Sequence, residues 1–204
     1  MPECNRRCII NSLGNSVCAE VIAAGVSCQI CIADLSTPDG VARVLDTCPQ
    51  PDVVVANAGV TIAGRVGTRD WAELEQMSYL LGVGVAHLLE GLVPAMTQRG
   101  SGDILIVSSI ASLITMPNSA MYAASKSFVT AYGRSLAAET ERFGIRVCVL
   151  CPGYVHTNLH ERAGSGGCRP LGRFTFRRFN SIWGLGYMRS PRRMLDRAYW
   201  LNRL

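Results

Sequence analysis

Short apolar runs alternate with longer amphipathic stretches along most of the chain. The apolar runs cover residues 28–33, 52–56, 103–108 and 145–150. The stretches between them predict helices over about 39–47, from 68 to about 96, and from about 118 to 143. Continuous apolar strands separated by helices are typical of a parallel sheet that is buried on both faces. We therefore expect a doubly wound α/β fold, in which ligands bind at the carboxyl ends of the strands.

Helix-boundary signals support this pattern. Thr37, Pro38 and Asp39 offer a cap and a first-turn proline for the first helix. Thr68 is the expected cap of the second helix, and Gly144 is expected to end the third.

Polar residues follow the predicted strands. Asp34, Asn57, Ser109 and Thr157 each come just past a strand. Each alone fits an ordinary turn or cap residue. Together they favour a crevice at the carboxyl edge of the sheet.

The chain has 20 Lys and Arg residues, and Lys126 is its only lysine. It follows Tyr122 by four positions in a predicted helix, so both side chains share one face. A nearby ammonium favours phenolate, and we expect Lys126 to lower the pKa of Tyr122.

Composition narrows the class of protein. With 204 residues, 49% of them hydrophobic, the chain suits one packed α/β domain. No apolar run approaches the 18 residues that a membrane span needs, and the amino terminus has no apolar secretory region. The sequence therefore predicts a cytoplasmic protein.

The nine cysteines include two C-x-x-C spacings, Cys28/Cys31 and Cys148/Cys151. Both lie in predicted strands, where residues three apart face opposite ways. Buried structural thiols are the preferred interpretation, with a disulfide or a metal role as alternatives. Cys151 with His156 and His160 could bind a metal, but no fourth ligand is evident, and we predict no metal.

Four motifs in fixed order resemble those of the classical short-chain dehydrogenase/reductases over about residues 20–160. They are Asn57-Ala58-Gly59, Val107-Ser108-Ser109, Tyr122-x-x-x-Lys126 and Pro152-Gly153-x-x-x-Thr157. The tyrosine–lysine spacing alone is weak, but the ordered set is highly specific.

The resemblance implies hydride transfer between a nicotinamide cofactor and a small carbonyl or alcohol. Tyr122 would be the general acid or base, and Ser109 would orient the substrate oxygen. Lys126 would support Tyr122 and bind the nicotinamide ribose. The family's oligomers further imply a homo-oligomer through the two long helices.

The same resemblance assigns cofactor-binding positions. Asp34 would contact the adenine, and Thr157 would hold the carboxamide. The remaining positions that would line the cofactor are Asn57, Ala58, Gly59, Tyr122, Lys126, Pro152, Gly153 and Val155. The expected cofactor is NADP(H), with NAD(H) as the alternative.

The sequence departs from the family in three ways. The family opens with a strand and a glycine-rich phosphate-binding turn, which this sequence lacks. The chain thus looks truncated near the family's second strand. That absence predicts an incomplete sheet with an unpaired edge, because the first strand lies between two others. Arg6 and Arg7 would fall where some members recognise the NADP 2′-phosphate, although two solvated arginines near a terminus are the preferred explanation.

The second departure is Leu81, where the family often has an asparagine that supports a proton relay to the lysine.

The third departure is the tail. Residues 1–160 form the expected partial domain, and residues 161–204 form an arginine- and aromatic-rich tail. From residue 169 onward there are nine arginines and one acid, Asp196. Such a tail fits a substrate lid or a quaternary contact, a nucleic-acid or membrane surface, or a frame or gene-remnant artefact.

Two functions remain from the sequence: an NAD(P)-dependent oxidoreductase, or a catalytically silent remnant that acts by binding. Apolar residues around the candidate site suggest a lipid-like or ketoacyl-like substrate, although core packing explains them more simply. They are Ile110, Leu113, Ile114, Met116 and Met121.

Overall fold

The computed structural model of the chain describes residues 7–10, 18–19, 22–25 and 27–153. The elements, in chain order, are β1 (Arg7–Ile10), β2 (Ser27–Ile30), α2 (Pro38–Thr47), β3 (Val53–Ala56), α3 (Trp71–Ser78), the π-helical turn η1 (Tyr79–Val83), α4 (Gly84–Arg99), β4 (Gly102–Val107), the 3-10 turn η2 (Ile110–Ser112), α5 (Ala120–Thr140), the 3-10 turn η3 (Glu141–Phe143) and β5 (Ile145–Leu150). The predicted site residues Val155 and Thr157, the two histidines after Cys151 and the tail lie outside the described residues.

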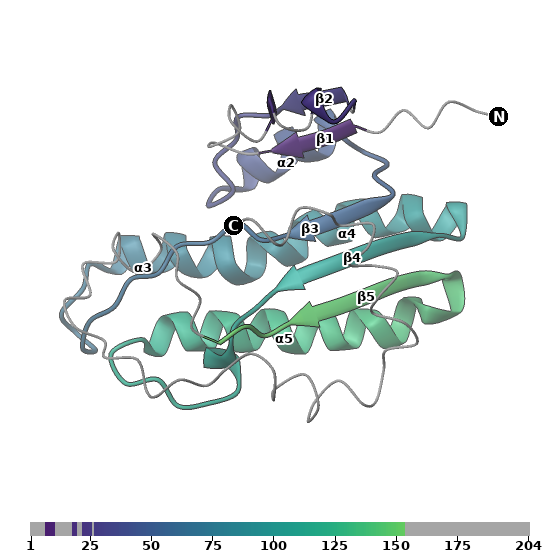
Figure 1. The fold of residues 1–204 in the computed structure, drawn as a ribbon. Helices are drawn as coiled ribbons and strands as arrows, with labels where there is room; N and C mark the ends of the chain where they lie inside the picture. The colour runs from purple at the N-terminus through teal and green to yellow at the C-terminus, as the bar shows by residue number, and fades with distance from the viewer. Residues whose placement is uncertain (1–6, 11–17, 20–21, 26, 154–204) are drawn as a thin grey trace.

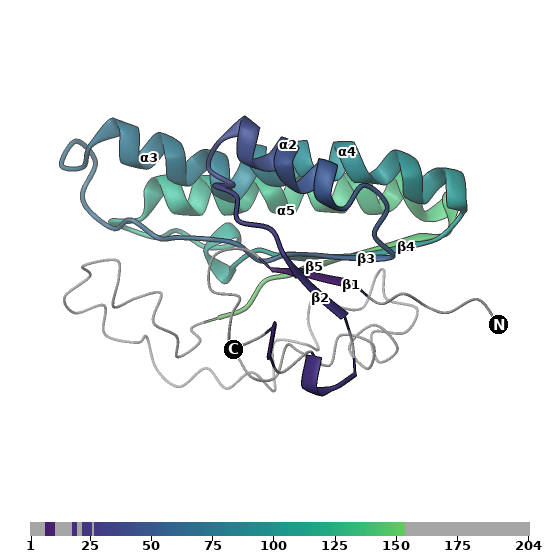
Figure 2. The same cartoon turned by 90° about the horizontal axis from the view of Figure 1, so that it is seen from above.

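The described strands form two parallel sheets, as the apolar runs predicted. One sheet has the order β1-β2, and the other has the order β3-β4-β5. All five arrows point the same way in Figure 1. Helices α2, α3, α4 and α5 cover one face of the strands, and the helical turns near residues 18–25 lie on the other side (Figure 2). The α/β fold class is therefore confirmed.

The strand layer is interrupted between β1 and β3, while the helix layer is continuous. Among the described residues, β3 pairs with β4 alone and β1 pairs with β2 alone. The side chains of Val53 and Val55 on β3 are 45% and 44% exposed. Helix α2 nevertheless packs against α4, with Leu45 lying over Gly91. The described residues thus show the break in the strand layer that the sequence predicted, with β1 on one side of it and β3 on the other.

The core lies between the three-stranded sheet and helices α4 and α5. Its most buried members are Leu89, Met96, Ile104, Ile106 and Val129. Gly133 lets α5 approach the sheet closely. A β-carbon at this position would lie 2.6 Å from Val149 Cγ2 and 2.7 Å from Ile106 Cδ1.

The predicted helix boundaries are mostly confirmed. Thr37 caps α2 by accepting a hydrogen bond from the Gly40 amide (3.1 Å), and Gly144 ends the last helical turn with φ 74°. The expected cap of the second helix was wrong. Asp70 caps α3 through the Ala72 amide, whereas the Thr68 hydroxyl donates to the Arg65 carbonyl.

The segment Trp71–Arg99 is one continuous helix that is long and apolar enough to cross a membrane by length and composition. The sequence did not predict a helix of this length and composition, because polar residues interrupt its apolar runs. In the fold, Leu89, Leu92 and Met96 of this helix pack in the core. The same length and composition therefore also suit a core helix.

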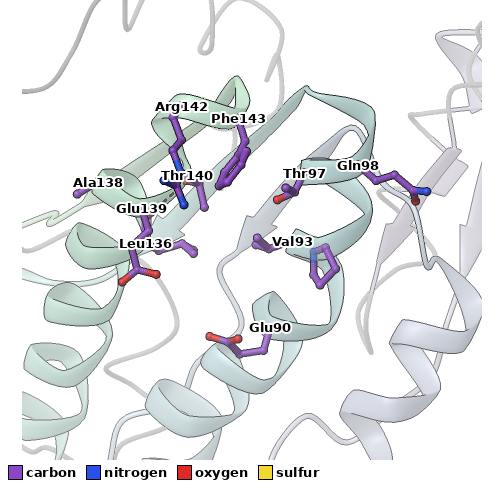
Figure 3. Close-up of a pocket in the computed structure, with 11 residues that line it drawn as sticks. Glu90, Val93, Thr97, Gln98, Leu136, Ala138, Glu139, Thr140, Arg142 and Phe143 are labelled. Carbon is purple, nitrogen blue, oxygen red and sulfur yellow. Dashed lines mark hydrogen bonds between the residues drawn. The ribbon is translucent and has the colours of Figure 1, made fainter.

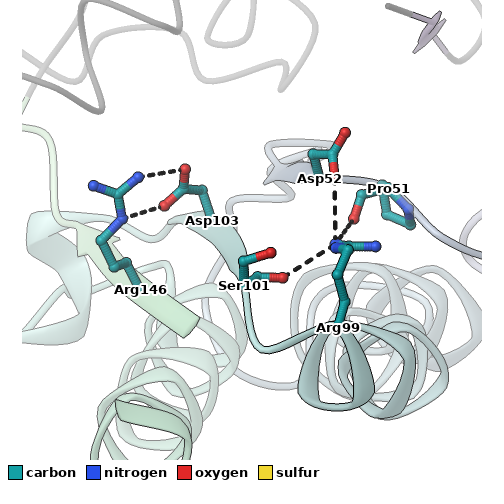
Figure 4. Close-up of polar contacts among 6 residues, drawn as sticks. All are labelled: Pro51, Asp52, Arg99, Ser101, Asp103 and Arg146. Carbon is teal, nitrogen blue, oxygen red and sulfur yellow. Dashed lines mark hydrogen bonds and ion pairs between the residues drawn. The ribbon is translucent and has the colours of Figure 1, made fainter. Parts of the chain in front are cut away.

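Polar contacts secure the amino ends of the three-stranded sheet (Figure 4). Arg146 binds Asp103 through two hydrogen bonds, Nε to Oδ1 at 2.5 Å and Nη2 to Oδ2 at 2.6 Å. Arg99 donates to the carbonyls of Pro51 (2.8 Å) and Ser101 (3.1 Å). These contacts lie at the edge opposite the predicted chemistry.

The cysteines divide into paired and free residues. Cys18 and Cys28 form a disulfide, which corrects the preferred expectation of a free structural thiol at Cys28. Cys31 is a buried free thiol, and Cys148 and Cys151 are free and partly buried. Residues 28 and 31 have separate environments, as strand alternation predicted. No cluster of metal-binding side chains occurs in the part of the chain that the structure describes.

Candidate active site

Five of the predicted site positions come together where β3, β4 and β5 end. Asn57 begins the turn after β3, and Ser109 lies two residues past β4. Pro152 follows β5, and its carbonyl accepts a hydrogen bond from the Ile110 amide (2.8 Å). Tyr122 and Lys126 lie in the first two turns of α5, which packs against β5 and η2. These five positions therefore lie at the carboxyl edge of the sheet, on the elements that the sequence predicted.

Lys126 is held as a buried ammonium. Its residue is 6% exposed, and Nζ donates to the carbonyl oxygen of Val107 at 2.8 Å. Nζ lies 6.0 Å from the centroid of the Tyr122 ring. Burial lowers the pKa of Lys126 to about 8, and the Cys151 thiol acts in the opposite direction. The charge of this group is thus sensitive to mildly basic pH.

Tyr122 is partly buried and hydrogen-bonded to the side chain of Ser109. Burial raises the pKa of Tyr122, and the hydrogen bond to Ser109 only partly opposes this effect. The expectation that Lys126 lowers this pKa was wrong for the chain by itself. The reason is that removal of water from the phenol disfavours phenolate more than the surrounding groups favour it.

Ser108 has a structural role that the sequence analysis did not assign. It is 3% exposed, and its hydroxyl lies 2.6 Å from Thr130 Oγ1 and donates to the Lys126 carbonyl at 3.1 Å. These contacts fix α5 against the end of β4. The signal was available, since Ser108 belongs to the motif that carries Ser109.

The loops of the site are linked through their side chains. Ser109 Oγ accepts a hydrogen bond from the Ala111 amide (3.1 Å), which starts the turn η2. Ser112 Oγ lies 3.7 Å from Cys151 Sγ. Ser127 of α5 donates to the Ser112 carbonyl at 3.1 Å. The segment after β4 is therefore fixed to both β5 and α5.

Asp34 lies in a turn between β2 and α2, apart from the tyrosine–lysine group. Its Oδ1 accepts hydrogen bonds from the Ser36 amide (2.9 Å) and hydroxyl (2.7 Å), and both lower the pKa of Asp34. The turn needs a glycine at position 40, because a β-carbon there would lie 1.8 Å from the Asp34 carbonyl oxygen. Asp34 is exposed and negatively charged near neutral pH.

Leu81 lies directly beside the turn that carries Asn57. A β-carbon on Gly59 would lie 3.0 Å from Leu81 Cδ2, and Leu81 is 1% exposed. It belongs to the π-helical turn η1, a rare element that often occurs at functional sites. An apolar side chain therefore fills this place beneath the turn.

Several residues at this edge of the sheet have groups that fit the nicotinamide end of a cofactor. Lys126 has three donors, and Val107 takes one of them in the described structure. A buried ammonium with free donors suits the hydroxyl groups of a ribose. Gly153 has open space around its α-carbon, and Asn57 and Gly59 are exposed. The glycine-rich turn that would bind the pyrophosphate has no counterpart in the sequence.

Apolar side chains next to the site are exposed rather than packed in the core. Leu113 and Ile114, which lie between η2 and α5, are 42% and 46% exposed. Ile110, Met116 and Met121 are partly buried. Core packing, the simpler interpretation of these residues, therefore fails for Leu113 and Ile114.

A shallow groove lies at the other end of α4 and α5 (Figure 3). Its lining includes Glu90 and Val93 of α4, Leu136 and Glu139 of α5, and Phe143. Tyr132 of α5 donates a hydrogen bond to Oε1 of Glu90, which lines the groove (2.8 Å). The groove is lined by residues 90–98 of α4 and by residues 136–143, whereas Tyr122 lies in the first turn of α5. It is therefore separate from the candidate active site.

Comparisons with known proteins agree with this geometry. The family model "short chain dehydrogenase" matches residues 9–166. The chain is 39% identical to a 1-deoxy-11-beta-hydroxypentalenate dehydrogenase of Streptomyces exfoliatus over 162 residues, covering 73% of this chain and 58% of that protein. It is 34% identical to the dehydrogenase/reductase SDR family member 7B of Danio rerio over 125 residues, covering 61% of this chain and 40% of the relative.

Among solved structures, a metagenomic short-chain oxidoreductase in complex with NADP superposes with a TM-score of 0.67. Its sequence is 29% identical, and the match covers 74% of this chain and 72% of that one. The chain spans about half the length of the curated relatives it matches. The family model covers most of the described residues, including every motif that the site contains. The chain belongs to the short-chain dehydrogenase family.

Proposed function

We propose that this chain carries the catalytic part of an NAD(P)-dependent oxidoreductase that interconverts a carbonyl and an alcohol. The observation that supports this most directly is the placement of Tyr122, hydrogen-bonded to Ser109, with the Lys126 ammonium 6.0 Å from its ring. The three side chains come from two elements and meet at the carboxyl edge of a parallel sheet, where α/β folds bind ligands. The comparison with dehydrogenases and reductases supports the same reaction class.

The proposed mechanism uses Tyr122 as the proton donor in carbonyl reduction. Its raised pKa keeps the phenol protonated at neutral pH, so a proton is available for the substrate oxygen. Ser109 would donate a hydrogen bond to that oxygen and hold it near Tyr122 Oη. A bound reduced nicotinamide would supply the hydride.

Lys126 would act both on the cofactor and on Tyr122. With one proton donated to Val107, its remaining donors would bind the ribose hydroxyls. Its charge would also stabilise the phenolate that forms when the proton leaves Tyr122. In the direction of alcohol oxidation, this charge would lower the cost of keeping Tyr122 deprotonated.

The cofactor proposed is NADP(H), with NAD(H) as the alternative. An NADP-bound relative of known structure supports a nicotinamide cofactor. The exposed carboxylate of Asp34 is suited to accept hydrogen bonds from an adenine amino group. Residues 1–6 lie outside the described structure, so the expected role of Arg6 beside the 2′-phosphate stays a prediction.

The proposed substrate is a carbonyl or alcohol compound with an apolar body. Leu113 and Ile114 expose apolar surface on the loop that follows Ser109, where a substrate oriented by Ser109 would lie. A homo-oligomer through α4 and α5 also remains a proposal. The groove in Figure 3, lined by Val93, Leu136 and Phe143, gives those helices a partly apolar outer surface.

Calorimetric titration of the protein with NADPH and NADH tests the enzymatic function. Trp71 is 63% exposed at the start of α3, so direct heat measurement is a sharper test than tryptophan quenching. We expect saturable binding of NADPH at millimolar levels or below. No binding of either cofactor would contradict the proposal for this chain and favour a silent, binding remnant.

A further inference from the structure

Two buried hydroxyl groups lie directly beside the main chain of Lys126. Ser108, which follows β4, is 3% exposed, and Thr130 of α5 is 6% exposed. Their hydroxyl oxygens are 2.6 Å apart, and the Ser108 hydroxyl donates to the Lys126 carbonyl at 3.1 Å. A hydroxyl group has one proton to donate. Thr130 therefore donates to Ser108, and the groups form one ordered chain that ends on the main chain of Lys126.

The side chain of Lys126 is held by the residue next to Ser108. Its Nζ donates to the Val107 carbonyl at 2.8 Å. Two consecutive residues therefore bind the two ends of Lys126, one through the ammonium and the other through the carbonyl. A lysine side chain has several rotatable bonds, and fixing both of its ends removes most of its conformations. The ammonium is thus confined to one place beside the carboxyl end of β4.

The hydroxyl of Thr130 is used differently from that of another buried threonine in the same helix. Thr140 is 4% exposed, and its hydroxyl donates to the Leu136 carbonyl of the preceding helical turn at 2.7 Å. That contact stays within α5. Thr130 instead contacts Ser108, whose amide continues the pairing of β4 with β5 by donating to the Leu150 carbonyl at 2.7 Å. Thr130 therefore joins the helix turn that carries Lys126 to the sheet.

We propose that Ser108 and Thr130 are positioning residues, which fix this turn of α5 so that the Lys126 ammonium stays on the Val107 carbonyl. Without the hydroxyl pair, the turn is free to shift from β4, and the ammonium leaves the carbonyl for water. The consequence for the reaction rests on the proposed function, because the ammonium in this place is the group that would bind the ribose and stabilise the phenolate of Tyr122.

The test observes Lys126 directly, since it is the only lysine of the chain. Labelling the full-length protein with carbon-13 lysine gives a single Cε resonance in an NMR spectrum. In the wild type we expect two distinct Hε signals, as for an immobilised side chain, and a titration midpoint near the lowered pKa of about 8. The titratable side chains that the described structure places near Nζ are Tyr122 and Cys151, and both stay unchanged in every variant.

Thr130→Val removes the first donor of the hydroxyl chain with little change in volume. We expect the two Hε signals to merge and the titration midpoint to rise by about one pH unit, because water favours the ammonium. Ser108→Ala should give the same changes. Thr130→Ser keeps the hydroxyl and should restore the two signals and the midpoint of the wild type.

Thr140→Val is the matched control, because it makes the same substitution at a similarly buried position of α5. It should lower the free energy of unfolding, measured in urea, without changing the Lys126 signals. Calorimetric titration with NADPH at pH 7 gives a second measurement. Thr130→Val should weaken NADPH binding about tenfold, as expected for one lost hydrogen bond to a charged group, and Thr140→Val should bind like the wild type.

The inference is overturned if Thr130→Val leaves the Lys126 signals and midpoint unchanged, or if Thr140→Val alters them equally. A wild-type midpoint near the ordinary 10.5 with merged Hε signals would also overturn it, and that result needs no variant to fold. The NMR measurements need no cofactor, so failure of NADPH to bind would contradict the proposed function alone. Normal NADPH binding with unchanged Lys126 signals in Thr130→Val would contradict the positioning role alone.

Discussion

The carboxyl end of the three-stranded sheet and the free edge of β3 belong to the same sheet but are supported differently. At the carboxyl end, β4, β5, η2 and α5 are joined by hydrogen bonds through Ser108, Ser112 and Ser127. At the edge, β3 has no described strand on the side away from β4, and Val53 and Val55 expose their side chains. The proton-transfer half of the site is thus assembled, whereas the half that would hold the rest of a dinucleotide has less support.

Proton transfer and cofactor affinity depend on different groups in this fold. A tyrosine, a serine and a lysine on rigid elements can transfer a proton once a substrate is in place. Tight binding of a dinucleotide also needs donors for its pyrophosphate, which a helix amino terminus usually supplies. We therefore expect this chain to show weak cofactor binding combined with an intact dependence on Tyr122.

The largest expected effect comes from Tyr122→Phe, which directly tests the proposed proton transfer. Loss of the phenolic proton should reduce carbonyl reduction by about 100-fold or more, since general acid catalysis commonly contributes that much. Cofactor affinity should change little, because the ring and Lys126 stay in place. Steady-state NADPH oxidation with a carbonyl substrate and calorimetry measure the two quantities. Unchanged turnover would refute the mechanism.

An intermediate effect is expected from pH, acting through Lys126. Its pKa is lowered to about 8, so the ammonium is present below pH 8 and is lost above it. If the ammonium binds the ribose, NADPH affinity should fall about tenfold between pH 7 and pH 9. Lys126→Arg stays charged throughout and should show a flat profile, even if its affinity is lower. A flat profile in the wild type would count against the ribose contact.

The same group predicts an opposite trend for stability. The pKa of Lys126 in the fold lies below its ordinary value of 10.5, so the unfolded chain binds more protons between these pH values. The contribution of Lys126 to the free energy of unfolding should therefore rise from pH 8 toward pH 10.5. Urea unfolding of wild type and Lys126→Met, followed across this range, checks the sign.

The smallest expected effect concerns the packing of α5 against the three-stranded sheet. Gly133→Ala places a β-carbon 2.6 Å from Val149 Cγ2, which forces side chains of the sheet to move. Such overpacking costs about 1–3 kcal/mol, while alanine gains about 1 kcal/mol of helix propensity, leaving a net loss of about 1 kcal/mol. Urea unfolding measures it, and Ser135→Ala on the exposed face of α5 is the matched control. A stabilised Gly133→Ala would show that α5 is not held tightly against the sheet.

The sequence predicted the fold class and the placement of Tyr122 and Lys126 on one helix, because both follow from local pattern. Apolar runs gave β4 and β5 nearly residue by residue, and the spacing of Tyr122 and Lys126 placed them on one helix face. The sequence also predicted the break in the strand layer that the described residues show between β1 and β3. Strand β1 was not predicted, because its four residues, Arg-Cys-Ile-Ile, are too few to show a clear periodicity.

The errors come from effects that a linear pattern does not contain. The raised pKa of Tyr122 depends on how much water the folded site excludes around the phenol. Capping by Asp70 rather than Thr68 depends on which side chain lies in line with the first free amides. The Cys18–Cys28 disulfide depends on an approach of two segments in space that neither spacing indicates. Each requires three-dimensional information.

The π-helical turn at Tyr79–Val83 affects which side chains of the long helix face the interior on either side of it. A turn closed by i→i+5 hydrogen bonds holds one more residue than an α-helical turn, so the apolar stripe shifts phase by about 100° across it. Met77 before the turn and Leu89 after it both reach the interior only because of this shift. Deletion of one residue between Tyr79 and Val83 would therefore restore a regular α-helix and keep the later side chains of α4 in phase with Met77, whereas the undeleted segment wound as a regular α-helix would rotate them by about 100°.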